Sequence, residues 1–197
     1  MAARFGYPVT LDLHGIPVLV VGAGPVAARK VAGLAAAGAV VRVVAPDVSA
    51  GMTAEVDEGH VETLTRRPFQ PKDVVGMRLV VAATGSDADH DVAVAASAAG
   101  IWVNAADRPD DCSYILPAVA RHGAVSIAVS SDGTSPALAQ RLRDDAARLL
   151  NDDVAALADR LSRQRTAIKA EGGSTELHDW SGDIEAILGP PPSSSPS

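Results

Sequence analysis

A glycine-rich turn in the first quarter of the chain has the residue types and spacing needed to hold a pyrophosphate. The segment reads GAGPVA, so Gly22, Gly24 and Ala27 occupy the three small-residue positions of a G-x-G-x-x-G/A pattern. The first glycine permits a tight turn, the second lets the backbone approach the phosphates, and the third small residue allows a helix to pack closely on a strand. A helix beginning at Pro25 points free N–H groups and its positive dipole end at the phosphates.

Asp47 supplies a second element of dinucleotide recognition. It lies 23 residues after Gly24, just after a second apolar run in the sequence. At this position a carboxylate can accept hydrogen bonds from a ribose. No arginine directly follows it, which favours NAD over NADP. The alternative is that the glycines only close a tight turn between a strand and a helix.

The elements that must position these residues alternate along the chain. Strand-like apolar runs occupy residues 8–13, 17–22, 40–45, 61–66, 78–83 and 101–106. Helical patterns separate them over 25–37, 50–60 and 87–99, with Gly38 and Gly100 as stops for the first and last. This alternation predicts an α/β fold with a Rossmann-like, doubly wound parallel sheet, in which 8–13 forms an edge strand.

The pattern changes after Asp107. Two extended runs, 113–119 and 124–130, predict a hairpin, and Ser135 with Pro136 predicts the start of a helix that reaches about residue 150. An amphipathic pattern continues to Ile168, and a last short helix is expected near 180–188.

Composition narrows the class of protein. The net charge of −7 argues against nucleic acid as the main partner, and no apolar run is long enough to span a membrane. The single cysteine, Cys112, suits a reducing compartment, and the start of the chain does not read as a signal peptide. We therefore expect a cytoplasmic protein. The five histidines show no metal-ligand spacing, so no resident metal is predicted.

Three further segments carry a family resemblance. They are the pair Arg29–Lys30, the run NAADRP (104–109) leading into CSYILP (112–117), and the run VSSDGTSP (129–136). Together and in this order they resemble the N-terminal portion of siroheme synthase and the free-standing precorrin-2 dehydrogenase/sirohydrochlorin ferrochelatases. The resemblance covers roughly residues 5 to 170.

The resemblance implies an NAD-dependent enzyme of siroheme biosynthesis that oxidises precorrin-2, a tetrapyrrole, to sirohydrochlorin. Many members of that family then insert Fe²⁺, and its members are homodimers. By this reading, residues 1–112 form the Rossmann NAD-binding domain and 113–150 the dimerisation segment. Residues 151–188 form a small helical C-terminal domain, and 189–197 form a disordered tail.

The same resemblance assigns residues to roles. The family's key carboxylate falls on Asp107, which is expected to act as general base. The expected cofactor contacts are Gly22, Gly24, Pro25, Val26, Ala27, Pro46, Asp47 and Thr84. The expected substrate-side residues are Asn104, Arg108, Ser131, Thr134 and Ser135. Asp132 departs from the family's pattern, which has glycine there.

Two other readings stay open. The chain could be a dehydrogenase alone, with a separate protein inserting the metal. It could also be a non-catalytic NAD-sensing module, although that reading leaves the NAADRP and VSSDGTSP segments without a purpose.

Overall fold

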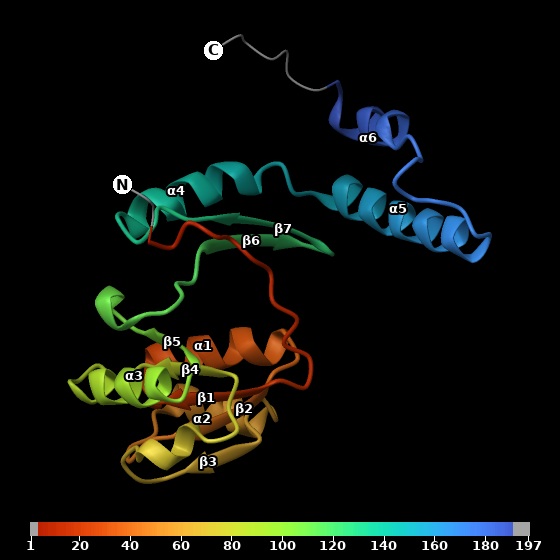
Figure 1. Cartoon of the computed structure of the whole chain (residues 1–197). Helices are drawn as coiled ribbons and strands as arrows, with labels where there is room; N and C mark the ends of the chain where they lie inside the picture. The colour runs from red at the N-terminus through yellow and green to blue at the C-terminus, as the bar shows by residue number, and fades with distance from the viewer. Residues whose placement is uncertain (1–3, 191–197) are drawn as a thin grey trace. The chain divides into compact units, whose positions relative to one another are not determined.

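A computed structural model describes residues 4–190 of the chain (Figure 1). It divides into two compact units, the first ending at Leu116 and the second beginning at Pro117. The predicted division at 112, 150 and 188 stays a prediction, and most of the predicted tail lies outside the described residues.

The first unit is built on a parallel five-stranded sheet with the strand order β3-β2-β1-β4-β5. The strands are β1 Pro17–Val21, β2 Val40–Val44, β3 Thr63–Thr65, β4 Leu79–Ala82 and β5 Trp102–Ala105. β1 and β4 are continuous apolar runs because both faces of a parallel sheet are covered, and β2 is interrupted only by the exposed Arg42. The predicted Rossmann-like, doubly wound sheet is confirmed.

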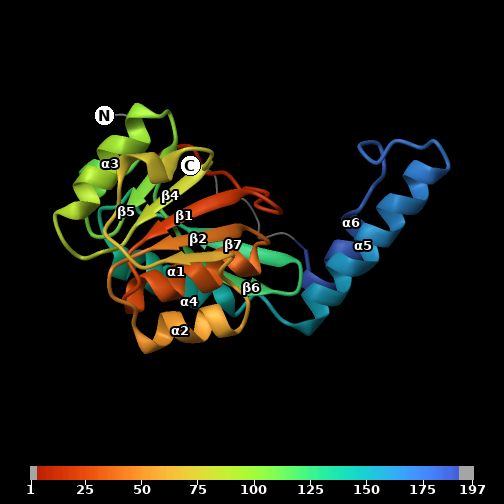
Figure 2. The same ribbon diagram turned by 90° about the horizontal axis from the view of Figure 1, so that it is seen from below.

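Helices cover the sheet on both faces (Figure 2). On one face lie α1 (Pro25–Ala36) and α2 (Ala50–Asp57), whose buried residues Val31 and Met52 pack with Val20 and Val43 of the sheet. On the other lies α3 (Ala88–Ala98), together with the short 3₁₀ helix η1 (Pro71–Val74). A second 3₁₀ helix, η2 (Pro109–Asp111), follows β5.

The chain itself covers the outer edge of β5. Val103 donates its N–H to the Ser113 hydroxyl at 2.6 Å, and its carbonyl accepts from the Ser113 N–H at 2.8 Å. The prediction of a strand over 113–119 was wrong at its start, since the strand begins only at Ala118. The reason is that Ser113 and Tyr114 bond to β5 instead of entering the hairpin.

The predicted edge strand over 8–13 was also wrong, because these residues form no strand. Pro8 has no N–H to give to a ladder. The Asp12 carboxylate accepts the N–H of His14 at 3.0 Å, and Ile16 donates to the carbonyl of Leu13, so the segment turns just before β1. Local turn hydrogen bonds of this kind compete with sheet pairing.

The second unit contains the predicted hairpin and three helices. β6 (Ala118–His122) and β7 (Val125–Val129) are antiparallel, and α4 (Pro136–Ala147) packs against both. α5 (Asp152–Ala170) and α6 (Ser181–Leu188) follow. Among the described residues, no helix is both long and apolar enough to cross a membrane.

An ion pair in the first unit makes its stability depend on pH. The guanidinium of Arg67 holds both carboxylate oxygens of Asp73, at 2.7 and 2.6 Å, and the N–H of Gln70 donates to the same carboxylate. The Arg67 hydrogen bond is the main reason that the pKa of Asp73 lies below its usual value of 3.8. A depressed carboxyl pKa stabilises the fold above the usual value, and this contribution is lost as pH falls through the folded pKa.

Asp73→Asn should therefore lower the free energy of unfolding at neutral pH by about 1–3 kcal/mol. It should also flatten the loss of stability below pH 4, because the substituted side chain does not titrate. Thermal unfolding from pH 7 to pH 2 measures both effects. Asp110→Asn is the control, since that carboxylate also pairs with an arginine, Arg4, but is fully exposed. Parallel pH curves for Asp73→Asn and the wild type would contradict the assignment.

Candidate active site

The turn after β1 can be built only with glycine at its first position. Gly22 has φ +107°. A Cβ placed on it would lie 2.3 Å from the carbonyl oxygen of Ala83, the residue that follows β4 in the chain. Its N–H donates to the carbonyl of Val44, at the end of β2. Gly22 therefore lets the turn pass between two neighbouring strand ends, which is the role predicted for it.

The amino end of α1 is open. Gly24 is its N-cap residue, no side chain caps the first turn, and Pro25 takes the first helical position. A Cβ on Gly24 would meet no heavy atom within 4 Å, whereas Ala27 is completely buried against the sheet. Uncapped first-turn N–H groups beside open space are what a bound phosphate requires. The residues present thus fit the pyrophosphate of a dinucleotide.

A cavity of about 640 Å³ lies against this helix end. Three segments line it, and all of them follow the carboxyl ends of strands, where ligands of open α/β sheets bind. The lining residues are Gly24, Pro25 and Val26 from the glycine turn; Ala83, Thr84, Gly85, Ser86, Asp87 and Asp89 from the loop after β4; and Ala106, Asp107 and Arg108 from the loop after β5. The size is typical of a small-molecule site.

Asp107 contributes an exposed carboxylate to this cavity. Its backbone has φ +60°, the left-handed conformation, which is uncommon outside glycine and is found mainly at turns and functional sites. The structure thus brings Asp107 to the same cavity as Gly24, Pro25 and Val26.

The loop after β4 is organised by a buried acid that sequence reasoning missed. Asp89 is 1% exposed, and its carboxylate accepts the N–H groups of Thr84 and Gly85 and the hydroxyl of Thr84, at 2.9–3.1 Å. Thr84, predicted as a cofactor contact, lines the cavity but gives its N–H and hydroxyl to Asp89. The available signal was an acid in the first turn of a helix, five residues after a threonine in the loop that follows a strand.

Arg108 also lines the cavity, in a network of charges. Its guanidinium pairs with Asp87 at 3.0 Å and with Asp111 at 3.1 Å. The bond to Asp87 is the largest reason that the Arg108 pKa lies above its usual value, and His90 is the largest reason that the Asp111 pKa lies below its own. Arg108 can meet a substrate carboxylate only by sharing or leaving these partners.

Asn104, the other predicted substrate residue of this unit, lies below the surface. It is 6% exposed, and its side chain bonds to Lys30 Nζ at 2.9 Å and to the carbonyl oxygen of Tyr114 at 3.1 Å. Burial lowers the pKa of Lys30 and raises the pKa values of Cys112 and Tyr114. The amide of Asn104 thus joins α1 to β5, and its contact with substrate stays a prediction.

The remaining predicted residues lie elsewhere. Pro46 and Asp47 are exposed just after β2 and do not line the cavity, although Ser49 donates to the carbonyl of Ala23 and ties that segment to the glycine turn. Ser131, Thr134 and Ser135 belong to the second unit. There, Ser131 bonds to the backbone of Ser135, and Ser135 caps α4.

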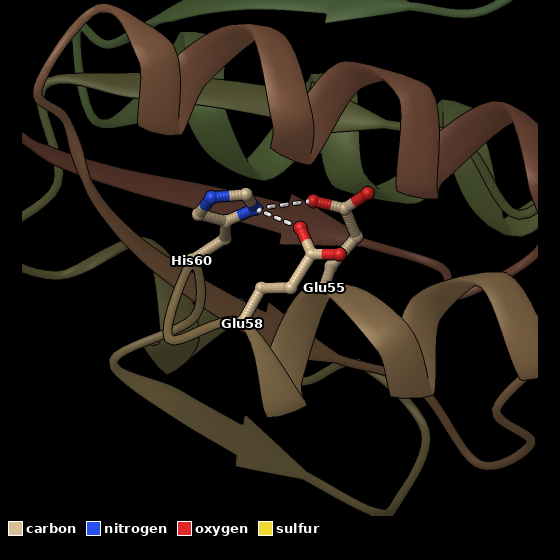
Figure 3. Close-up of side chains that lie close together, drawn as sticks. All are labelled: Glu55, Glu58 and His60. Atoms are coloured by element: carbon tan, nitrogen blue, oxygen red, sulfur yellow. Dashed lines mark hydrogen bonds and ion pairs between the residues drawn. The ribbon is translucent and has the colours of Figure 1, made fainter.

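One cluster unites three possible metal ligands at the end of α2 (Figure 3). His60 Nδ1 lies 2.7 Å from a Glu55 oxygen and 3.5 Å from a Glu58 oxygen. These residues lie on a helix end and the turn after it, and their spacing contains no pair of histidines that would have marked a metal site in the sequence. As the groups stand, the imidazole is hydrogen-bonded directly to Glu55, and this hydrogen bond accounts for the arrangement.

The comparisons with known proteins agree with this geometry. Residues 9–118, more than half of the chain, match the family described as "Putative NAD(P)-binding", and residues 123–148 match "Sirohaem biosynthesis protein central". The chain belongs to this NAD(P)-binding family. The resemblance carried by the three sequence segments is thereby confirmed.

The chain is similar in sequence to several siroheme synthases. The chain is 37% identical to the siroheme synthase of Actinobacillus pleuropneumoniae serotype 3 (strain JL03) over 83% of its length, and 44% identical to that of Pseudomonas putida (strain F1) over 69%. It spans about a third of these relatives, 34% and 29% of their lengths. The solved structure of SirC, precorrin-2 dehydrogenase, matches with a TM-score of 0.66 and 29% identity, over 92% of this chain and 87% of that one.

Proposed function

We propose that this protein is an NAD-dependent precorrin-2 dehydrogenase, which oxidises precorrin-2 to sirohydrochlorin in siroheme biosynthesis. One observation carries the proposal: Asp107 lines the same cavity as the open amino end of α1. The similarity to SirC and to siroheme synthases gives the reaction its substrate.

The cofactor half of the proposal rests on the glycine turn. Gly22 and Gly24 bring the backbone close to the phosphates, and the uncapped first turn of α1 supplies N–H donors. Asp47, after β2, is proposed to bind the adenine ribose, and the absence of an arginine behind it favours NAD over NADP. Bound NAD⁺ supplies the hydride acceptor.

The chemical half rests on Asp107. Oxidation of the macrocycle removes one hydride and one proton, so a base must stand where the proton leaves. The Asp107 carboxylate is exposed to the cavity and has no ion-pair partner within 4 Å among the described residues. It is therefore free to accept that proton as the hydride departs.

Further features belong to the proposal. The carboxylates of the tetrapyrrole are proposed to meet Arg108, whereas the roles of Ser131, Thr134 and Ser135 stay expectations of the resemblance. The protein is proposed to act as a cytoplasmic homodimer and to use Fe²⁺ as a second substrate, as its resemblance to the bifunctional enzymes suggests. Dehydrogenation without metal insertion is the alternative.

A spectroscopic assay tests the function. Purified protein mixed with NAD⁺ and precorrin-2 under anaerobic conditions should produce NADH absorbance in step with the spectrum of sirohydrochlorin, and NADP⁺ should serve less well. A sensing module would bind NAD⁺ and produce no NADH, which is the outcome that contradicts the proposal. Adding Fe²⁺ or Co²⁺ to sirohydrochlorin with the protein then distinguishes a bifunctional enzyme from a dehydrogenase alone.

A further inference from the structure

The loop after β4 holds a short chain of hydrogen bonds that runs from the protein interior to the cavity. It begins at Asp89, which is 1% exposed. One oxygen of its carboxylate accepts both the N–H and the hydroxyl of Thr84, each at 2.9 Å, and the other accepts the N–H of Gly85 at 3.1 Å. A hydroxyl has a single proton, and the Thr84 hydroxyl gives it to Asp89.

The direction of this bond fixes the direction of the next one. The hydroxyl oxygens of Thr84 and Ser86 lie 2.9 Å apart. Because the Thr84 proton is given to Asp89, Ser86 is the donor between the two hydroxyls. The N–H of Ser86 also donates to the Thr84 oxygen, at 3.2 Å. The Thr84 hydroxyl therefore uses its one proton and both of its lone pairs inside the loop, and it has no hydrogen-bonding capacity left for a ligand.

The Ser86 hydroxyl keeps one unused acceptor position. Its proton goes to Thr84, and one of its two lone pairs accepts the N–H of Ala88 at 3.3 Å. Within residues 4–190, no other group bonds to this oxygen. Ser86 is exposed and lines the same cavity as Gly24 and Pro25. A ligand that bonds to Ser86 must therefore supply the proton, which a phosphate or carboxylate anion cannot do.

We propose that Ser86 is a cofactor-binding residue whose hydroxyl oxygen accepts a hydrogen bond from the nicotinamide half of NAD⁺, and that Thr84 and Asp89 are the positioning residues that set the direction of this hydroxyl. The inference rests on the proposed function, in which the cavity holds the dinucleotide. The phosphates are assigned to Gly24, and Asp47, assigned to the adenine ribose, lies outside the cavity. The nicotinamide half is thus the part that reaches the loop after β4, and its donors are ribose hydroxyls and carboxamide N–H groups.

Removing the acceptor should weaken cofactor binding. Ser86→Ala should raise the Kd for NAD⁺ by about 3–10-fold, the usual contribution of one hydrogen bond between neutral groups. Isothermal titration calorimetry measures this Kd without turnover. Ser97→Ala makes the same change on an exposed serine of α3 that does not line the cavity, and should leave the Kd unchanged. A folded Ser86→Ala protein with the wild-type Kd overturns the inference.

One analogue identifies the donor on the cofactor. In 3-acetylpyridine adenine dinucleotide both riboses are kept, and a ketone without N–H groups replaces the carboxamide. If Ser86→Ala also weakens binding of this analogue, the bond to Ser86 comes from a ribose hydroxyl. If the loss is seen with NAD⁺ alone, the bond comes from the carboxamide. Either result supports an acceptor at Ser86.

The role of Thr84 can be separated from direct contact with the cofactor. Thr84→Val removes the hydroxyl that takes the Ser86 proton, so it should weaken NAD⁺ binding in the wild-type background and cost no further affinity in Ser86→Ala. Thr84→Ser keeps the hydroxyl and should bind NAD⁺ as the wild type does. Equal losses from Thr84→Val in the two backgrounds would mean that Thr84 binds NAD⁺ by itself, which overturns its positioning role.

The role of Asp89 can be measured without cofactor. Asp89→Asn replaces one acceptor oxygen by a donor, so the N–H of Thr84 or of Gly85 loses its acceptor and should exchange with solvent about 3–10-fold faster. Asp91→Asn, an exposed acid of the same helix, is the control and should leave both amides unchanged. Unchanged exchange at both amides in Asp89→Asn would remove Asp89 from the chain of bonds.

The two proposals can fail separately. A wild-type protein that binds NAD⁺ but makes no NADH from precorrin-2 rejects the proposed function, and the binding measurements still decide the role of Ser86. Conversely, an active wild type whose affinity for NAD⁺ does not depend on Ser86 leaves the function intact and rejects the inference.

Discussion

Asp107→Asn should lower kcat for NAD⁺-dependent oxidation of precorrin-2 by about 10²–10⁴-fold, the usual contribution of a general base. An amide cannot accept the proton that must leave the macrocycle. Asparagine tolerates the left-handed conformation that Asp107 adopts at φ +60°, so the loop should keep its course. Binding of NAD⁺ should change little, because the glycine turn is untouched. Stopped-flow NADH absorbance and a separate NAD⁺ titration measure the two quantities.

The control for this substitution lies three residues away. Asp110→Asn makes the same chemical change on a fully exposed side chain of η2 that does not line the cavity, and should leave kcat near the wild-type value. An Asp107→Asn protein that retains wild-type kcat, or that loses kcat only as much as Asp110→Asn does, removes Asp107 from the mechanism.

Gly22→Ala should cost about 2–5 kcal/mol of the free energy of unfolding, from backbone strain at positive φ together with overpacking. The added methyl would meet the backbone of Ala83 at 2.3 Å and of Thr84 at 2.9 Å, and neither can move without parting β4 from β1. For a domain whose whole stability is about 5–15 kcal/mol, this is a large share. Urea denaturation followed by circular dichroism measures the loss.

Two other glycines separate the causes. Gly59 has φ +77° and no neighbour for an added Cβ, so Gly59→Ala should show the conformational cost alone, about 1–2 kcal/mol. Gly24 has an ordinary φ and open space, so Gly24→Ala should cost less than about 1 kcal/mol but weaken NAD⁺ binding at the helix end. Equal losses of stability for all three variants would contradict the steric explanation.

The alternation of strands and helices in the first unit could be predicted from sequence because its central strands, β1 and β4, are runs of apolar residues. Val18–Val21 and Leu79–Ala82 are buried on both faces of the sheet. Gly38 and Gly100, which have positive φ, directly follow helices and end them. The prediction of a strand over 8–13 failed because the apolar residues of this segment alternate as they do in a strand, whereas the Asp12 side chain forms a turn there. Periodicity does not reveal such a local competitor.

The site was only partly predictable. The glycine pattern and Asp107 were found because they are local in sequence or carried by the resemblance. The anchoring of Thr84 by Asp89 and of Asn104 by Lys30 depends on the fold, since the second pair is 74 residues apart. Asp132 stands where the family has glycine, and it adopts φ +53°, so the departure changed the side chain while the backbone kept a conformation suited to glycine.

Ser113, which bonds to the outer edge of β5, should affect how the protein aggregates in concentrated solution. An open strand edge offers unpaired donors and acceptors on which another chain can add a strand, and sheets that present one are prone to aggregate. Here Ser113 takes up both backbone groups of Val103 within the same chain. The sheet therefore stops growing at β5 without a further strand, and copies of the protein have no template there for stacking edge to edge.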